Sequence, residues 1–166
     1  THNVKIHTHL GETEDETRFC LDHYGMRPLD YLEDMNMLNN DIWLAHGIHF
    51  DTNEIARLGN AKVGVSHCPS SNMILSSGIC PVFELEKAGV NVGLGVDGSS
   101  SNDSSNMIQE LREAMLLQRL KSGASKISHL DAIRWGTSGS AACIGRSDIG
   151  ELSVGKQADI AMFSLK

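Results

Sequence analysis

The sequence lacks the features that mark several common classes of protein. No apolar run approaches the roughly 18–20 residues that a membrane-spanning helix needs, so no membrane segment is predicted. Lys and Arg number 14 against 21 Asp and Glu, and no basic block stands out, so the positive surface typical of nucleic-acid-binding proteins is missing. The four cysteines form no Cys-x-x-Cys pair, which argues against a structural zinc knuckle and a disulfide scaffold. Without a recognisable N-terminal signal, we expect a cytoplasmic protein with free thiols.

What the sequence does contain is an alternation of short β-like runs with helix-like stretches. Its 166 residues, 40% of them hydrophobic, suffice for one domain with a real core. The β-like runs cover residues 4–9, 42–46, 63–67 and 90–97. The helix-like stretches cover residues 13–23, 28–37, 52–58, 81–88, 105–120 and 129–143. This order, without hairpin signals, is typical of parallel βαβ units. Because a (β/α)8 barrel needs eight strands and about 250 residues, the chain predicts an α/β fold equal to half of such a barrel.

Two of these helix predictions name particular residues. Asp51 is expected to cap the start of a helix that Gly59 ends. In the stretch 105–120, Ile108, Leu111 and Met115 fall on one face, which predicts the buried side of that helix.

The last part of the chain departs from the alternation. From Gly150 onward the pattern predicts two short strands around a Gly155-Lys156 turn. We therefore expect residues 1–148 to belong to the half barrel and residues 149–166 to supply strands of a small accessory β-sandwich.

Four residues with metal-binding or acid–base side chains lie at the ends of the β-like runs. They are His9, His46, His67 and Asp97. In a parallel β/α fold the C-terminal ends of the strands converge on one face, so these side chains can share a site. Imidazole and carboxylate groups are common ligands of divalent metals. A buried, hydrogen-bonded histidine could explain any one of them, but the whole series predicts a metal-dependent enzyme.

The first β-like run carries a second histidine two positions before His9. His7 and His9 point the same way from a strand, so the pair can supply two ligands to one metal. Glu12 follows in the loop above the same end of the strand. In the alternative interpretation His7 is a packed strand residue and Glu12 a solvated charge, and the pattern alone leaves both open.

The segment Gly93-Leu94-Gly95-Val96-Asp97-Gly98 fits the Gly-x-Gly-x-x-Gly pattern of a dinucleotide-binding loop. A nucleotide-binding α/β module is therefore an alternative from a different functional class. Against it, Asp97 would place a carboxylate where the phosphates must lie, and the next helix begins only after the serine-rich patch 99–105. An aspartate at a strand end beside histidines is better explained as a metal ligand or a base.

Several of these motifs occur together in one known family. The motifs are His9-Leu10-Gly11-Glu12, Ala45-His46-Gly47, Ser66-His67-Cys68-Pro69-Ser70-Ser71-Asn72, Gly95-Val96-Asp97-Gly98 and the tail 150–159. Their order resembles the amidohydrolase superfamily, and in particular its aminohydrolase branch. The resemblance implies the C-terminal half of a (β/α)8 metal-dependent hydrolase barrel, and it spans nearly the whole chain.

The resemblance also implies roles for individual residues. His9 would be a metal ligand from the fifth barrel strand, and Asp97, from the eighth, would be both a ligand and a proton acceptor. Glu12 would bind substrate and donate a proton to a ring nitrogen. His46 would bind substrate and polarise the attacked centre or hold the water, and His67 would contribute to substrate binding. The residues 68–72 are expected to form a loop that hydrogen-bonds a ligand.

The reaction implied is hydrolytic deamination of a purine-like heterocycle of the 8-oxoguanine or guanine type. One divalent metal ion, zinc with iron as the alternative, would lower the pKa of its water to near 7 and so activate it for attack. A triazine or S-adenosylhomocysteine type of aminohydrolase is the alternative within the superfamily. The family's other His-x-His ligands are absent, so we expect two of four protein ligands and no activity from this chain alone. The small-molecule substrate and a homodimer are the expected partners.

Overall fold

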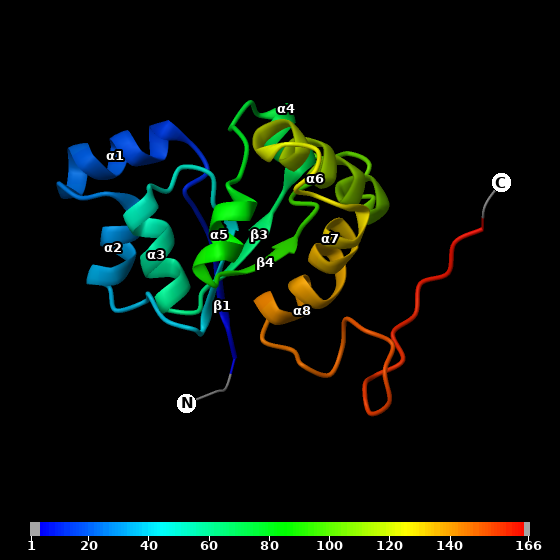
Figure 1. Ribbon diagram of the computed structural model, residues 1–166. Coiled ribbons are helices and arrows are strands. Elements are labelled where there is room, and N and C mark those ends of the chain that lie inside the picture. The colour runs from blue at the N-terminus through cyan, green and yellow to red at the C-terminus, as the bar shows by residue number, and fades with distance from the viewer. Residues whose placement is uncertain (1–3, 165–166) are drawn as a thin grey trace.

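The computed structural model describes residues 4–164, and four parallel strands form its centre (Figure 1). They are β1 (Ile6–Leu10), β2 (Ile42–His46), β3 (Gly64–His67) and β4 (Asn91–Leu94). Their order in the sheet is the order in the chain, and each neighbouring pair is parallel. The predicted succession of βαβ units is therefore present.

Helices connect and follow the strands. They are α1 (Glu14–Tyr24), α2 (Pro28–Asp34), α3 (Thr52–Asn60), α4 (Pro69–Ile74), α5 (Val82–Ala88), α6 (Met107–Ser122), α7 (His129–Arg134), the π-helical turn η1 (Trp135–Gly139) and α8 (Ser140–Cys143). None of the helices in residues 4–164 has both the length and the apolar character needed to cross a bilayer.

Local capping explains where α1 and α3 begin. Thr13 accepts a hydrogen bond from the Glu16 N–H and so caps α1. Asp51 caps α3 in a reciprocal arrangement with Glu54, as a capping box. The predicted stop at Gly59 is wrong, because α3 continues to Asn60. Gly59 instead allows close packing, since a Cβ there would lie 2.0 Å from a backbone oxygen of α5.

The buried side of α6 also differs from the prediction. Ile108 is exposed, whereas Glu110, Ala114 and Gln118 are buried. Leu111 is partly buried against the core, as Met115 is. Apolar periodicity failed here because two of the innermost positions are polar and hydrogen-bonded, and such positions carry no apolar signal.

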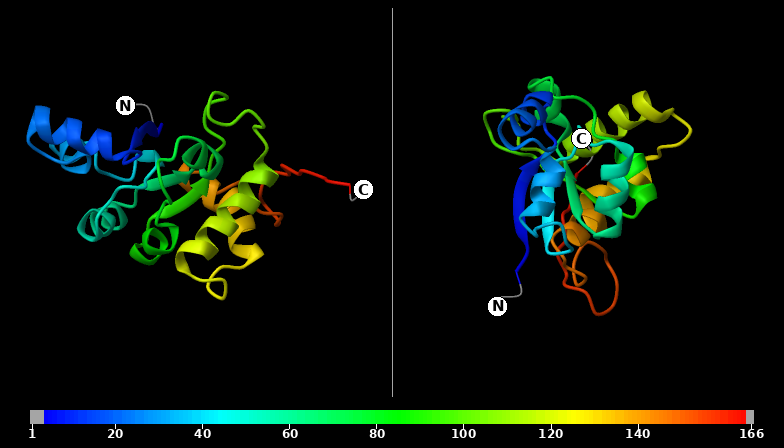
Figure 2. Two further views of the ribbon diagram at one scale, coloured as in Figure 1. Left: turned by 90° about the horizontal axis from the view of Figure 1, so that it is seen from above. Right: turned by 90° about the vertical axis from the view of Figure 1, so that its left-hand side faces the viewer.

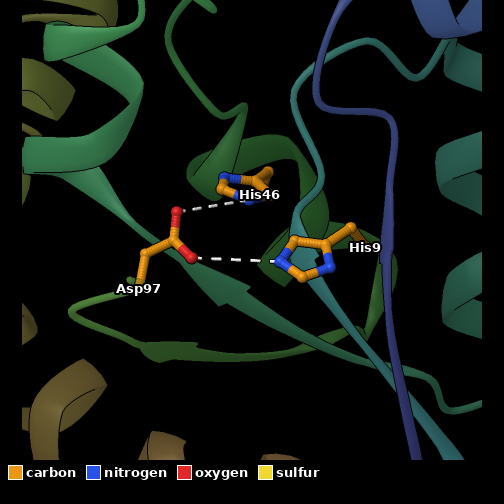
Figure 3. A group of neighbouring side chains, drawn as sticks. All are labelled: His9, His46 and Asp97. Carbon is orange, nitrogen blue, oxygen red and sulfur yellow. Dashed lines mark ion pairs between the residues drawn. The ribbon is translucent and has the colours of Figure 1, made fainter. Parts of the chain in front are cut away.

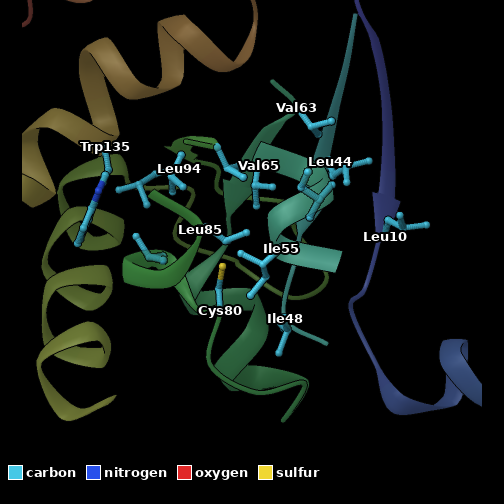
Figure 4. Packing of buried hydrophobic residues seen from close by; sticks show 14 of the residues in the cluster. Leu10, Leu44, Ile48, Ile55, Val63, Val65, Cys80, Leu85, Leu94 and Trp135 are labelled. Atoms are coloured by element: carbon cyan, nitrogen blue, oxygen red, sulfur yellow. The ribbon is translucent and has the colours of Figure 1, made fainter. Parts of the chain in front are cut away.

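One face of the sheet forms the hydrophobic core (Figure 4). Leu44, Val65 and Val92 lie side by side in the strand register and are almost completely buried. Helices α3, α5 and α6 run along this side of the sheet, as the left view of Figure 2 shows. Leu58 of α3 and Leu85 of α5 belong to the same buried cluster. We call this the outer face, because it corresponds to the helix-covered surface of a barrel.

The opposite face of the sheet, here the inner face, is more polar and carries His9. Helix α8 packs closely against two strands of this face. A Cβ on Gly93 would lie 2.7 Å from the Cα of Ser140, and one on Gly64 would lie 2.9 Å from the Cα of Cys143. The absence of side chains at these two glycines therefore lets α8 rest on strand backbone.

The C-terminal tail extends away from the body of the protein (Figure 1). Over 149–164 the structure has no strand, and residues 165 and 166 lie outside the described part. The predicted turn is present: Gly155 has φ of 90°, and the Lys156 N–H donates to the Ser153 oxygen at 3.2 Å. Val154 and Met162 are almost fully exposed. The two strands and the accessory sandwich stay predictions.

Candidate active site

Three side chains of the kinds that bind metal ions lie together at the C-terminal end of the sheet: His9, His46 and Asp97 (Figure 3). His9 Nε2 lies 3.9 Å from Asp97 Oδ1, and His46 Nε2 lies 3.7 Å from Asp97 Oδ2. One ligand atom from each residue falls within 4.8 Å of the other two. The structure thus brings together three of the four strand-end residues that the sequence singled out.

Unusual backbone conformations place two members of this cluster. His46 has φ of 72° and Asp97 has φ of 60°, both in the left-handed region that non-glycine residues rarely adopt. Each costs on the order of 1–3 kcal/mol, and such strain is concentrated at functional sites. In the register His46 is level with Leu10, which belongs to the core, so a regular strand would turn both toward the outer face. The left-handed turn at His46 instead directs its ring to Asp97.

Glu12 lies beside the cluster, two residues after β1 ends. Its Oε2 is 3.6 Å from His46 Nε2, and its side chain is about one-quarter exposed. The Glu12 N–H donates to Glu16 Oε2 at 2.9 Å, which ties the loop to the first turn of α1. Gly11, with φ of 68°, makes the turn between His9's strand and Glu12. The predicted proton donor is therefore within reach of the same space as the metal-type residues.

The carboxylate of Asp97 is prepared to stay ionised. Ser71 Oγ donates to Asp97 Oδ2 at 2.6 Å. Burial by itself raises the pKa of Asp97, but the hydrogen bonds from Ser71 and the Gly98 N–H, together with the two nearby histidines, outweigh it. The pKa therefore lies below its usual value. An ionised carboxylate is what a metal ligand and proton acceptor requires.

His67 lies apart from the cluster. It is completely buried, and burial followed by the proximity of His46 lowers its pKa to about 3, so its ring is neutral. Its Nδ1 lies 3.4 Å from Nδ2 of Asn72, whose Oδ1 lies 2.8 Å from Nδ1 of His46. The structure links His67 to the site through Asn72, and its contact with substrate stays a prediction.

The His7 side chain does not join the cluster either. Its ring stacks on Trp43 with centroids 3.6 Å apart, and its Nδ1 lies 3.1 Å from the Trp43 carbonyl oxygen. The packed-strand interpretation of His7 fits this geometry, and the two-ligand interpretation does not. Both rings line an inner-face cavity of about 200 Å³ that also reaches His9 and Asp97.

Sequence reasoning missed helix α4 and the two side chains that it presents. The residues 68–72 were expected to form a loop, but Pro69 starts a helix at its first position, where proline is favoured. The helix directs Ser71 to Asp97 and Asn72 to His46. The proline immediately after a strand is the signal that could have indicated it.

A buried carboxylate joins the two segments that flank the cluster. Glu110 of α6 is completely buried and accepts hydrogen bonds from the Ser70 N–H at 3.2 Å and from Asn102 Nδ2 at 2.7 Å. Asn102 Nδ2 also lies 2.8 Å from the Val96 oxygen. Glu110 therefore holds the start of α4 against the loop that follows Asp97.

The structure gives no support to a dinucleotide-binding loop at Gly93–Gly98. Helix α6 begins only at Met107, so no helix N-terminus adjoins these glycines to receive a pyrophosphate. Gly93 packs against α8, and a Cβ on Gly95 would lie 2.7 Å from Ser66 Oγ. The glycines serve close packing inside the fold.

Comparison with known proteins agrees with the geometry. The chain matches the amidohydrolase family over residues 1–166. It belongs to that family. This amidohydrolase is 60% identical over 164 residues to 8-oxoguanine deaminase of Pseudomonas aeruginosa, covering 99% of this chain and 36% of the relative. It is 42% identical over 161 residues to 5-methylthioadenosine/S-adenosylhomocysteine deaminase of Halobacterium salinarum, covering 96% and 37%.

A solved structure supports the fold in the same way. The amidohydrolase chain superposes on an adenosine deaminase from Xanthomonas campestris with bound zinc, with a TM-score of 0.90 and 35% identity. The match covers 93% of this chain and 36% of that one. The predicted fold class, part of a (β/α)8 barrel, is confirmed. The chain spans little more than a third of the length of these relatives.

Proposed function

We propose that this chain supplies part of the active site of a metal-dependent deaminase that hydrolyses a purine-like heterocycle of the 8-oxoguanine or guanine type. The observation that carries the proposal is the convergence of His9, His46 and Asp97 on one point beside Glu12. The 60% identity with the Pseudomonas aeruginosa 8-oxoguanine deaminase supports the substrate class.

The donor set fits a single divalent cation. Imidazole nitrogens and carboxylate oxygens are ligand types that zinc, iron and manganese share. Bonds of about 2.0–2.2 Å place tetrahedral ligand atoms about 3.3–3.6 Å apart, and one candidate atom from each of the three residues lies within 4.8 Å of the other two here. We propose zinc, with iron as the alternative, because the Xanthomonas campestris neighbour holds zinc.

His9 and Asp97 are the proposed ligands of that cation. His46 Nε2 faces the same space and is available to hold the attacking water. Further ligands would come from parts of the full-length enzyme outside these 166 residues, so the chain alone is expected to bind metal weakly and to lack turnover. Bound there, a divalent cation supplies the Lewis acidity that makes water acidic enough to lose a proton near neutral pH.

The chain's own residues divide the proton transfers between them. Asp97, kept ionised by Ser71, accepts a proton from the water as its oxygen forms a bond to the amino-bearing ring carbon. Glu12, partly buried beside His46, donates a proton to the neighbouring ring nitrogen. The exocyclic C–N bond then breaks as Asp97 passes its proton to the leaving amine, so ammonia departs. The remaining hydroxyl proton returns to Glu12 as the carbonyl forms. Water is consumed, and a carbonyl replaces the amine.

A panel of substrates tests the proposal with the full-length gene product loaded with zinc. Ammonia release is measured with 8-oxoguanine, guanine, adenosine, S-adenosylhomocysteine and hydroxylated triazines. We expect the largest kcat/KM for 8-oxoguanine. A larger value for S-adenosylhomocysteine would favour the function of the Halobacterium salinarum relative instead, and no release from any compound by the metal-replete protein would refute a deaminase.

A further inference from the structure

One amide side chain touches both buried histidines near the site. Asn72 is 1% exposed and lies in α4, where its backbone is held by hydrogen bonds to Cys68 and Ser77. Its Oδ1 lies 2.8 Å from Nδ1 of His46, and its Nδ2 lies 3.4 Å from Nδ1 of His67. No other side chain in residues 4–164 hydrogen-bonds the His46 ring.

The two contacts determine where hydrogens sit on the rings. The amide oxygen only accepts, so Nδ1 of His46 must carry a hydrogen and donate it. The amide nitrogen only donates, so Nδ1 of His67 must be the unprotonated acceptor, and the hydrogen of that neutral ring is on Nε2. Within the described residues His67 Nε2 has no partner, so the contact with Asn72 is the one hydrogen bond that the ring makes.

The orientation of the amide therefore has a consequence at the site. With the oxygen toward His46, Nδ1 holds the hydrogen whenever the ring carries only one. Nε2 is then unprotonated toward the space between Glu12 and Asp97, at 3.6 and 3.7 Å from their oxygens. With the amide reversed, its nitrogen would donate to Nδ1 of His46, and Nε2 would carry the hydrogen instead. The two states offer opposite chemistry: the first can accept a hydrogen bond or bind a cation, and the second can only donate.

We propose that Asn72, anchored by His67, is a positioning residue that holds His46 in the tautomer with its Nδ1 hydrogen directed into the protein and its Nε2 free toward the site. The assignment rests on the proposed function only for its catalytic consequence. Asn72 acts through His46 and itself touches neither the carboxylates nor the cavity that the site encloses. In this tautomer His46 can hold a water by accepting its hydrogen.

The tautomer can be measured directly by NMR. The full-length gene product, loaded with zinc and labelled with ¹⁵N-histidine, is recorded in two-bond ¹H–¹⁵N correlation spectra, with the His46 signals assigned from their loss in His46→Gln. We expect the pattern of an Nδ1-protonated ring in the parent protein. Asn72→Asp retains the acceptor and is expected to keep the Nδ1 hydrogen, whereas Asn72→Ala is expected to lose it.

Kinetics and a matched control separate positioning from folding. We expect Asn72→Ala to lower kcat by about tenfold or more while KM changes little, since supporting residues of this kind contribute about 10–100-fold. Gln118→Ala removes an equally buried amide, which donates to the Cys80 oxygen at 2.9 Å and has no hydrogen bond to His46 in the described residues. It controls for lost stability and should leave both the His46 signals and kcat unchanged.

The outcomes distinguish this inference from the proposed function. An Nε2-protonated His46 in the parent protein, or an Nδ1 hydrogen that persists in Asn72→Ala, would overturn the inference even if the protein deaminates purines. An Nδ1-protonated His46 that depends on Asn72 would support it even if no heterocycle is hydrolysed. Where Asn72→Ala does not fold, the comparison of Asn72→Asp with Asn72→Leu decides in the same way.

Discussion

The two faces of the sheet are built on different principles. The outer face is apolar and closely packed, with Leu44, Val65 and Val92 in register under the helices. The inner face carries His9 and glycines, and at the C-terminal end of the sheet the backbone is strained at His46 and Asp97. The packing of the outer face supplies the stability that allows the inner face to hold polar groups in strained backbone conformations. Substitutions should therefore separate stability from chemistry according to the face that they change.

The largest effect is expected from the carboxylate of the inner face. Asp97→Asn removes the proposed proton acceptor and the proposed anionic metal ligand, so we expect kcat/KM of the full-length enzyme to fall about 10³-fold or more. Steady-state ammonia release and metal content by mass spectrometry measure it. Asp103→Asn, an exposed carboxylate in the same loop, is the matched control and should change neither. Comparable losses from both variants would contradict the assignment.

A truncation on the outer face should do the reverse. Leu44 is completely buried, and Leu44→Ala is expected to lower the free energy of unfolding by about 2–5 kcal/mol while leaving the metal content of the folded enzyme unchanged. Denaturant unfolding measures the difference. Leu120→Ala, at a position 78% exposed, should cost less than about 0.5 kcal/mol. A large fall in kcat of the folded Leu44→Ala enzyme, without a loss of unfolding free energy, would contradict this division between the two faces.

A smaller effect is expected from the hydroxyl that supports Asp97. Ser71→Ala removes a hydrogen bond to a carboxylate, which contributes about 1.5–3 kcal/mol, and it raises the pKa of Asp97 toward its ordinary value or above. Because the group must be ionised to accept a proton, the loss of activity on acidification should begin at a higher pH than in the parent. A pH–rate profile tests this. Ser104→Ala, whose hydroxyl bonds Asn102 instead, should leave the profile in place.

For a change of one pH unit, the smallest effect on stability is expected from His67. Its folded-state pKa of about 3 lies below the 6.5 of the unfolded chain, so between these values the unfolded state binds a proton that the native state does not. Stability is therefore full above pH 6.5 and falls on acidification, by up to about 1.4 kcal/mol per pH unit. His67→Gln should flatten the slope of unfolding free energy against pH by that amount. An identical slope in both proteins would show that His67 charges in the folded state.

The sequence was most informative where function depends on strand ends. The β-like runs before His9, His46 and Asp97 predict parallel strands, and parallel strands bring their C-terminal residues together. The cluster was therefore predictable without coordinates. Its supporting residues were not, because Ser71 and Asn72 are small polar residues in a stretch that resembles a loop, and their roles depend on the helix that Pro69 starts.

The buried side of α6 was predicted wrongly from apolar periodicity because two of its buried residues are polar. Glu110 and Gln118 lie on the buried side of α6, where Glu110 accepts a hydrogen bond from the Ser70 N–H and Gln118 donates one to the Cys80 oxygen. A pattern of apolar residues cannot indicate partners that are far apart in the chain. Ile108 was consequently assigned to the interior although it is exposed. The tail 149–164 illustrates the opposite case, a β-like pattern that forms no strand in the structure.

The resting of α8 on Gly64 and Gly93 has a consequence for redesign of the cavity. The Cys143 thiol is directed to the Asn91 oxygen at 3.1 Å, and burial raises the pKa of that thiol to about 12, so it offers no reactive handle. Replacing Gly64 or Gly93 by a residue with a side chain would displace α8 from the strands. Ile144 lines the cavity and is exposed, so substitutions at this position are the better way to change the depth of the cavity.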